Sequence, residues 1–131
     1  MKQLRALIVD DSSVMRKIVQ RAFQQAGVEF ASVMEAGNGQ EALELIAKNQ
    51  FDLILSDINM PVMDGLTFVR ELKSVDAAKG VPVIMITTEG SQTQVMEAIQ
   101  CGARGYIRKP FTADQVKSRI APLFESESAA Q

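Results

Sequence analysis

The fold of this chain is decided at residues 51–57, FDLILSD, where a short apolar run ends on the carboxylate of Asp57. Continuous rather than alternating apolar residues are typical of a strand buried on both faces of a parallel sheet. A turn-rich segment, INMPVMDG, follows at residues 58–65. Because parallel strands all point the same way, polar residues at their carboxyl ends collect at one edge of the sheet, where ligands bind.

Outward from this run, the same unit of a short apolar run and a longer segment of helical period occurs five times. We expect strands at residues 4–9, 31–36, 51–56, 82–88 and 104–108. We expect helices at residues 13–26, 39–48, 66–72, 92–101 and 113–124. The alternation predicts an α/β fold, a doubly wound five-stranded parallel sheet with five helices. The pattern admits the flavodoxin-like strand order 2-1-3-4-5, although the order itself is not visible in a sequence.

Composition indicates one compact domain at residues 1–124, with a short flexible tail at residues 125–131. A chain of 131 residues, 47% hydrophobic, can bury roughly two thirds of its surface in a single core. No apolar stretch is long enough to span a membrane. The formal net charge is −2 and the sequence has no basic block, which argues against binding of nucleic acid. Zero histidines and one cysteine exclude the usual zinc sites and Ser/His/Asp or Cys/His catalysis. We expect a cytoplasmic monomer.

Polar residues end four of the five runs: Asp10 and Asp11, Asp57, Thr87, and Lys109. A carboxylate such as Asp57 can act as a nucleophile. At ~4 Å, a pair of carboxylates repels by roughly 1 to 4 kcal/mol, so three of them favour a divalent cation, for which Mg²⁺ is suited. Each residue alone has a simpler explanation, because the acidic pair could cap a helix and Lys109 could be a solvated surface lysine. Only the combination favours a shared site.

The chain up to about Phe124 resembles the receiver domains of response regulators, in particular the single-domain regulators of chemotaxis. The resemblance is carried by four motifs in order: VDD at residues 9–11, SDINMPVMDG at 56–65, TTE at 87–89 and GYIRKPF at 105–111. It implies two-component signalling, in which a histidine kinase phosphorylates Asp57. The output would be docking, most directly to the flagellar motor switch, and a phosphatase is a further candidate partner. Such a protein is not an enzyme, although it catalyses its own phosphorylation and dephosphorylation.

The resemblance also assigns roles around the metal. It implies that Asp11 and Asp57 bind Mg²⁺ directly, that the backbone carbonyl of Asn59 adds another oxygen, and that Asp10 acts through water.

Further roles concern the phosphoryl group and the response to it. The resemblance implies that Thr87 and Lys109 contact the phosphoryl group, and that Thr87 and Tyr106 form a switch. From the expected helices and strand we predict a partner surface of mixed apolar and basic character, comprising Gln92, Val95, Ile99, Tyr106, Arg108, Val116 and Arg119.

Three alternatives remain beside this prediction. A haloacid-dehalogenase-type phosphatase would need a second acid two residues after Asp57, where Asn59 stands. A flavodoxin-like electron carrier would need a phosphate-binding loop rich in Ser, Thr or Gly after the first strand, and none is evident. A single-domain phosphorelay or phosphate-sink receiver with a non-motor partner would share the pocket, so the sequence leaves it open.

Overall fold

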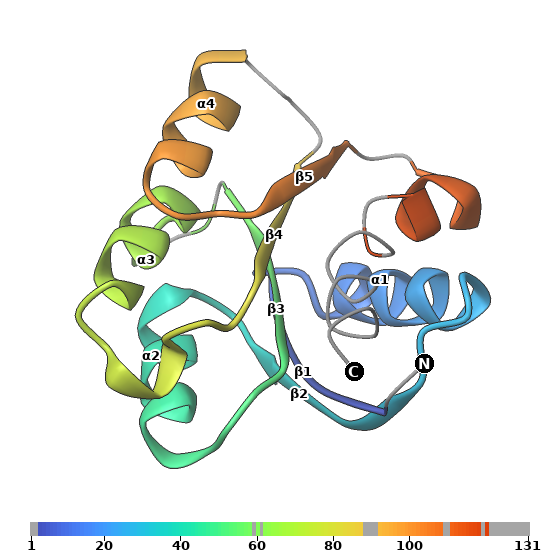
Figure 1. The fold of residues 1–131 in the computed structure, drawn as a ribbon, viewed down its shortest axis with the longest axis horizontal. Coiled ribbons are helices and arrows are strands. Elements are labelled where there is room, and N and C mark those ends of the chain that lie inside the picture. The colour runs from blue at the N-terminus through green and yellow to red at the C-terminus, as the bar shows by residue number, and fades with distance from the viewer. Residues whose placement is uncertain are drawn as a thin grey trace.

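The computed structural model describes residues 3–58, 60, 62–87, 92–108, 111–118 and 120, without the side chains of residues 77, 87, 92, 94 and 95. Its centre is one parallel sheet in the order β2-β1-β3-β4-β5 (Figure 1). The strands are β1 (Leu4–Val9), β2 (Phe30–Ala36), β3 (Leu53–Asp57), β4 (Val83–Thr87) and β5 (Gly105–Arg108). The expected order 2-1-3-4-5 is therefore confirmed.

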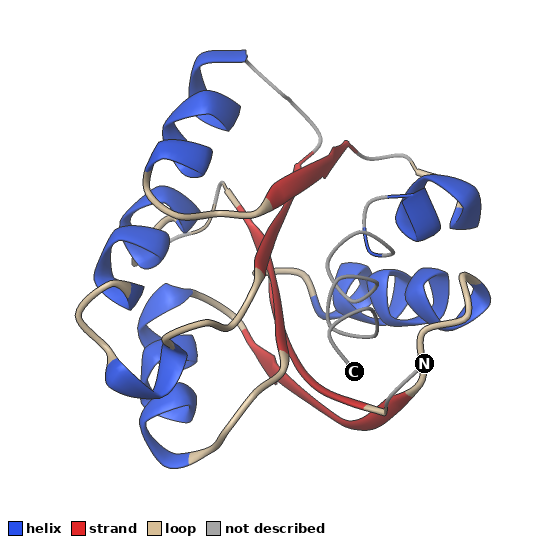
Figure 2. Cartoon of the chain, in the orientation of Figure 1, coloured by secondary structure: helices blue, strands red, loops and turns tan. Residues whose placement is uncertain are grey.

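Helices cover both faces of the sheet, as the doubly wound prediction requires. They are α1 (Ser13–Gln25), α2 (Gly39–Lys48), α3 (Gly65–Leu72) and α4 (Gln92–Gln100), with a 3₁₀ turn η1 (Asp76–Ala78) and helical residues at 113–118. Figure 2 shows α2, α3 and α4 on one side of the strands, and α1 with residues 113–118 on the other. None of the helices in the described part of the chain is long and apolar enough to cross a membrane.

Two hydrophobic layers result, one on each face. Phe68 lies at 0% exposure in the layer under α2, α3 and α4, and Phe23 lies at 0% in the layer under α1. Neighbouring residues of β1 alternate between the layers, because Leu7 packs in the first and Ile8 in the second. Burial on both faces explains why the residues of β1, β3 and β4 read as continuous apolar runs.

Element boundaries differ from the predicted ones mainly at the third strand. Phe51 and Asp52 precede β3. The amide of Asp52 still donates to the carbonyl of Arg5 at 2.7 Å, but the N–H of Arg5 donates to the Asp52 carboxylate at 2.9 Å, and this carboxylate also pairs with the Arg5 guanidinium at 3.0 Å. At its other end β3 continues through Asp57, which pairs with Ile86 of β4. The predicted tail at 125–131 lies outside the described residues.

Candidate functional site

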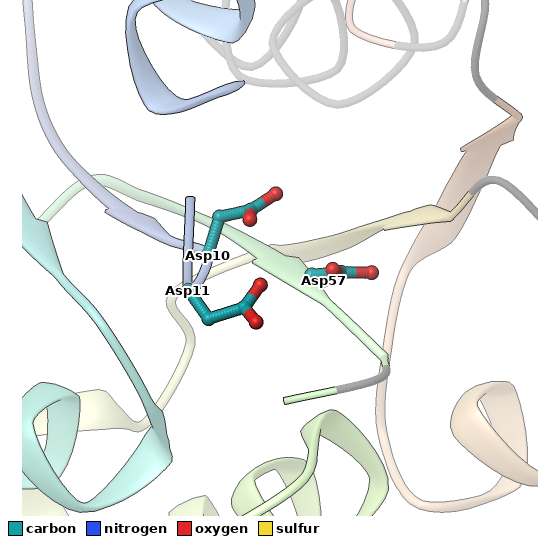
Figure 3. A group of neighbouring side chains, drawn as sticks. All are labelled: Asp10, Asp11 and Asp57. Carbon is teal, nitrogen blue, oxygen red and sulfur yellow. The ribbon is translucent and has the colours of Figure 1, made fainter. Parts of the chain in front are cut away.

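Strand register brings the acidic residues together. Val9 of β1 pairs with Ser56 of β3, so Asp10 and Asp57, the next residues on each chain segment, emerge side by side at the carboxyl edge of the sheet. Asp10, Asp11 and Asp57 each offer a carboxylate oxygen within 4.8 Å of the others (Figure 3). Asp10 is buried, Asp57 is half-buried and Asp11 is exposed. The three carboxylates that we predicted at strand ends therefore lie close together in the structure.

Asp10 is restrained through its backbone and its side chain. Its N–H donates to the carbonyl of Ala36 at 3.0 Å, which extends the β1–β2 pairing by one residue. Its Oδ1 accepts from the N–H of Ser12 at 2.9 Å. Ser12, rather than Asp10, caps α1, because the Ser12 hydroxyl accepts from the N–H of Met15 at 3.2 Å. Helix capping and the acidic cluster are therefore compatible functions of the same segment.

Asp57 is oriented by the loop that follows it. Its Oδ1 accepts from the N–H of Ile58 at 2.7 Å, and the Gly65 N–H closes the loop by donating to the carbonyl of Ile58 at 2.7 Å. A Cβ at Gly65 would collide with the carbonyl oxygen of Asp57 and lie 2.8 Å from the Cα of Ile58. Only glycine allows this approach, a requirement that the sequence, where Asp64 and Gly65 read as ordinary turn residues, did not indicate.

A second feature missed from the sequence is a group of ion pairs formed by Arg16, Lys17 and Glu35, which contacts the acidic cluster through Arg16. Arg16 donates from Nη1 to the carbonyl of Asp10 at 2.6 Å and from Nε to Glu35 at 2.8 Å. Lys17 donates from Nζ to the other oxygen of Glu35 at 2.8 Å. The hydrogen bonds from Lys17 and then Arg16 lower the pKa of the Glu35 carboxyl. No pattern of residue spacing in the sequence predicts this contact, because Arg16 and Glu35 lie on different elements.

The other predicted residues of the pocket are placed only in part. Thr87 ends β4 and pairs with Arg108 of β5, next to the β3 end that carries Asp57, but its side chain is not described. Asn59 and Lys109 lie outside the described residues. Tyr106 in β5 is half-buried and packs against the hydrophobic layer under α2, α3 and α4.

The predicted partner surface needs one correction. Ile99 on α4 is 47% exposed and Arg108 on β5 is exposed, as a docking surface requires. Val116 is 0% exposed and packs in the hydrophobic layer under α1, so its assignment to the surface is wrong. Met96 on α4, absent from the prediction, is 55% exposed. The side chains of Gln92 and Val95 are not described, and Arg119 lies outside the described residues.

The donor set of the cluster decides which ions it suits. Three carboxylates with closely spaced oxygens form a hard, anionic site, which fits Mg²⁺ or Ca²⁺ better than a metal that prefers nitrogen or sulfur. The three carboxylates repel one another, and a bound divalent cation offsets that repulsion. The residues present therefore fit a hard divalent ion.

Comparisons with known proteins agree on one family. The model of the response regulator receiver domain matches residues 6–121. The chemotaxis protein CheY-3 of Vibrio cholerae is 40% identical over 124 residues, covering 95% of this chain and 94% of that protein. The chemotaxis protein CheY of Pseudomonas aeruginosa is 38% identical, covering 93% and 97%. Among solved structures, the chemotaxis response regulator CheY4 of Vibrio cholerae superposes with a TM-score of 0.79 at 37% identity, covering 93% and 99%.

Proposed function

The chain belongs to the response regulator receiver domain family, and from that premise we propose that it signals by accepting a phosphoryl group on Asp57 from a histidine kinase. The observation that carries the proposal is the cluster of Asp10, Asp11 and Asp57, with oxygens within 4.8 Å of one another at the ends of β1 and β3. The family is one of signalling proteins, so the phosphoryl group is the signal rather than a product.

In the proposed reaction a carboxylate oxygen of Asp57 attacks the phosphorus of the donor. A phosphorus–oxygen bond forms, the bond to the donor's leaving group breaks with its electron pair, and an acyl phosphate results. The N–H of Ile58, at 2.7 Å from Oδ1, holds the carboxylate in one orientation. Asp11 and Asp57, with the carbonyl of Asn59 and with Asp10 acting through water, would hold Mg²⁺, and the ion would supply positive charge to neutralise the phosphoryl oxygens. We assign Lys109 and Thr87 to contacts with those oxygens.

The signal leaves the site, in this proposal, through β4 and β5. Thr87 ends β4, and Tyr106 lies on β5 opposite Met85 of β4, so a shift of Thr87 toward the phosphoryl group is transmitted to the neighbouring strand. A coupling of about 1 to 3 kcal/mol suffices for such a switch. The output surface then comprises α4 and β5 residues with Arg119, and excludes the buried Val116.

We propose the partner of this protein from the names of similar proteins. Two relatives near 40% identity are named chemotaxis proteins, which favours the flagellar motor switch as the docking target over a phosphorelay protein. Host cells that lack the protein should lose reversal of flagellar rotation while still swimming. Normal reversals in such cells would instead favour the phosphorelay or phosphate-sink role.

The phosphoryl acceptor is tested by intact mass after incubation with acetyl phosphate and Mg²⁺. Wild type should gain one phosphoryl group, whereas Asp57→Asn and chelated wild type should gain none. Asp64→Asn is the matched control, because Asp64 lies in the same loop but caps α3 through the N–H of Thr67 at 2.8 Å. This control should gain the group as wild type does. A gain by Asp57→Asn equal to that of wild type would contradict the proposal.

A further inference from the structure

We propose that Arg16, held in place by Glu35, is a positioning residue for the Asp10–Asp11 pair. The inference rests on the proposed function, because it assigns these carboxylates to the bound cation. It concerns a residue that touches neither the cation nor the phosphoryl group. Arg16 contacts instead the backbone carbonyl of Asp10, and so acts on the acidic pair through the main chain.

The guanidinium group of Arg16 forms hydrogen bonds to two separate parts of the chain. Arg16, in α1, directs Nη1 to the carbonyl oxygen of Asp10 at 2.6 Å and Nε to Oε1 of Glu35, in β2, at 2.8 Å. Both distances are short, as charge-assisted hydrogen bonds are. The side chains of Arg16 and Glu35 are 17% and 27% exposed, so the pair is partly shielded from water. The end of β1 is thereby tied to α1 and β2 at once.

The carbonyl of Asp10 matters because it belongs to the peptide unit that joins Asp10 to Asp11. A hydrogen bond to this carbonyl fixes the plane of that unit, and the plane sets the direction in which the Cα–Cβ bond of Asp11 leaves the chain. Within the described part of the chain, no side-chain hydrogen bond holds the Asp11 carboxylate itself. Its position in the cluster therefore depends on the backbone that Arg16 restrains.

Glu35 has a separate task in this arrangement. A guanidinium beside three carboxylates would otherwise compete with a cation for them. Glu35 accepts one arm of the fork and a second bond from Lys17 at 2.8 Å, which keeps the charge of Arg16 paired away from the cluster. Lysine at position 16 would have a single charged head in place of the planar fork, so it could not make both bonds equally well.

The expected effect is on cation affinity. Partners that orient metal ligands without touching the metal typically change its affinity by roughly 10- to 100-fold when they are removed. We expect Arg16→Met to weaken Mg²⁺ binding at least tenfold, and Arg16→Lys to weaken it less. Maximal phosphorylation by acetyl phosphate should return at high Mg²⁺, because Arg16 does not contact the reacting atoms.

The test is titration of the full chain with Mg²⁺ alone by isothermal calorimetry. Lys17→Met is the matched control, because it removes the other cation from the same Glu35 carboxylate without touching Asp10. This variant should bind Mg²⁺ within twofold of wild type. Thermal unfolding of each variant, followed by circular dichroism, shows whether it is folded, and Arg16→Lys serves in place of Arg16→Met if the latter is not.

Three results separate the possibilities. Weaker Mg²⁺ binding by folded Arg16 variants, with the Lys17 variant unchanged, supports the positioning role. Wild-type affinity in a folded Arg16→Met, or in Arg16→Lys where Arg16→Met does not fold, even with a lowered melting temperature, would reduce Arg16 to a purely structural residue and overturn the inference. Failure of wild type itself to bind Mg²⁺ would instead overturn the proposed function.

Discussion

Three carboxylates at the carboxyl edge of the sheet are placed to bind a cation, and without one they repel one another. Asp10, Asp11 and Asp57 were predictable from the sequence, because each ends an apolar run and parallel strands end at one edge. Arg16 and Glu35 were not predictable, because their contact joins α1 to β2 and leaves no periodic signal. Side chains whose role depends on a tertiary contact need the structure.

Asp11→Asn tests how far repulsion among the three carboxylates destabilises the fold. Without a divalent cation, we expect the variant to have a free energy of unfolding about 1 kcal/mol above wild type, because an exposed member of a repelling cluster is neutralised. With Mg²⁺ at about 100 times its Kd, wild type should gain about 2.7 kcal/mol and the variant clearly less. Urea unfolding with and without Mg²⁺ measures both. Equal responses of the two proteins to Mg²⁺ would exclude Asp11 as a ligand.

Glu35→Gln tests the ion pair beside the cluster. Hydrogen bonds from Lys17 and Arg16 lower the pKa of Glu35 in the folded state below its ordinary value of 4.5. The ionised carboxylate therefore stabilises the fold above that pH, and its contribution is lost as the pH falls through the lowered pKa. Wild type should exceed the variant in stability at neutral pH, with a difference that shrinks below pH 4.5. A difference independent of pH would contradict this account.

At the scale of elements, the loop from β3 to α3 is the most demanding part of the site. Gly65 packs against the backbone of Asp57 and Ile58, so a Cβ there must displace the residue that carries the proposed nucleophile. We expect Gly65→Ala to lower the free energy of unfolding by about 1 to 3 kcal/mol and to slow phosphorylation of Asp57.

Gly105→Ala is the control for this substitution. A Cβ at Gly105 in β5 would meet Ile84 Cδ1 at 3.6 Å, an ordinary contact. Unfolding in urea should place this variant within about 0.5 kcal/mol of wild type, with unchanged phosphorylation. Equal losses for the two glycines would mean that the approach to Asp57 is not special.

Most elements were predictable because their hydrophobic periods are long and regular. The strand over residues 4–9 and the helix that begins after Ser12 agree with β1 and α1. The third strand was placed too early because Phe51 is apolar and buried, although the carboxylate of Asp52, rather than a main-chain carbonyl, accepts from the N–H of Arg5. Val116 was assigned to the surface, yet its spacing of four residues from Ile120 is that of one helix face, and both are buried.

At the scale of the whole molecule, the sheet separates two exposed apolar sites with different expected roles. Met96 and Ile99 lie on α4, and Val14 at 69% exposure and Ile18 at 48% lie on α1 across the sheet. Exposed apolar residues that lie together can mark an interaction surface, and only the α4 pair belongs to the output surface proposed above. We expect Ile99→Ser to weaken binding of the phosphorylated protein to its proposed partner, the motor switch protein, at nearly unchanged stability.

Val14→Ser is the control, because it removes an apolar side chain that is even more exposed, 69% against 47% for Ile99, from the other face. Binding measured with both phosphorylated variants should fall only for Ile99→Ser. A loss for Val14→Ser alone would place the docking surface on α1. The overall architecture was predictable from the alternation of runs, whereas the exposure of these side chains followed only from packing.

The central claim, that Asp57 receives the phosphoryl group, is tested most directly by locating that group. Borohydride reduces an acyl phosphate to an alcohol and so converts the modified aspartate to homoserine, which peptide mass mapping detects. After phosphorylation in Mg²⁺, the account predicts homoserine at position 57 and unmodified residues at Asp10 and Asp11, although their oxygens lie within 4.8 Å. Reduction at Asp10 or Asp11, with Asp57 intact, would contradict it.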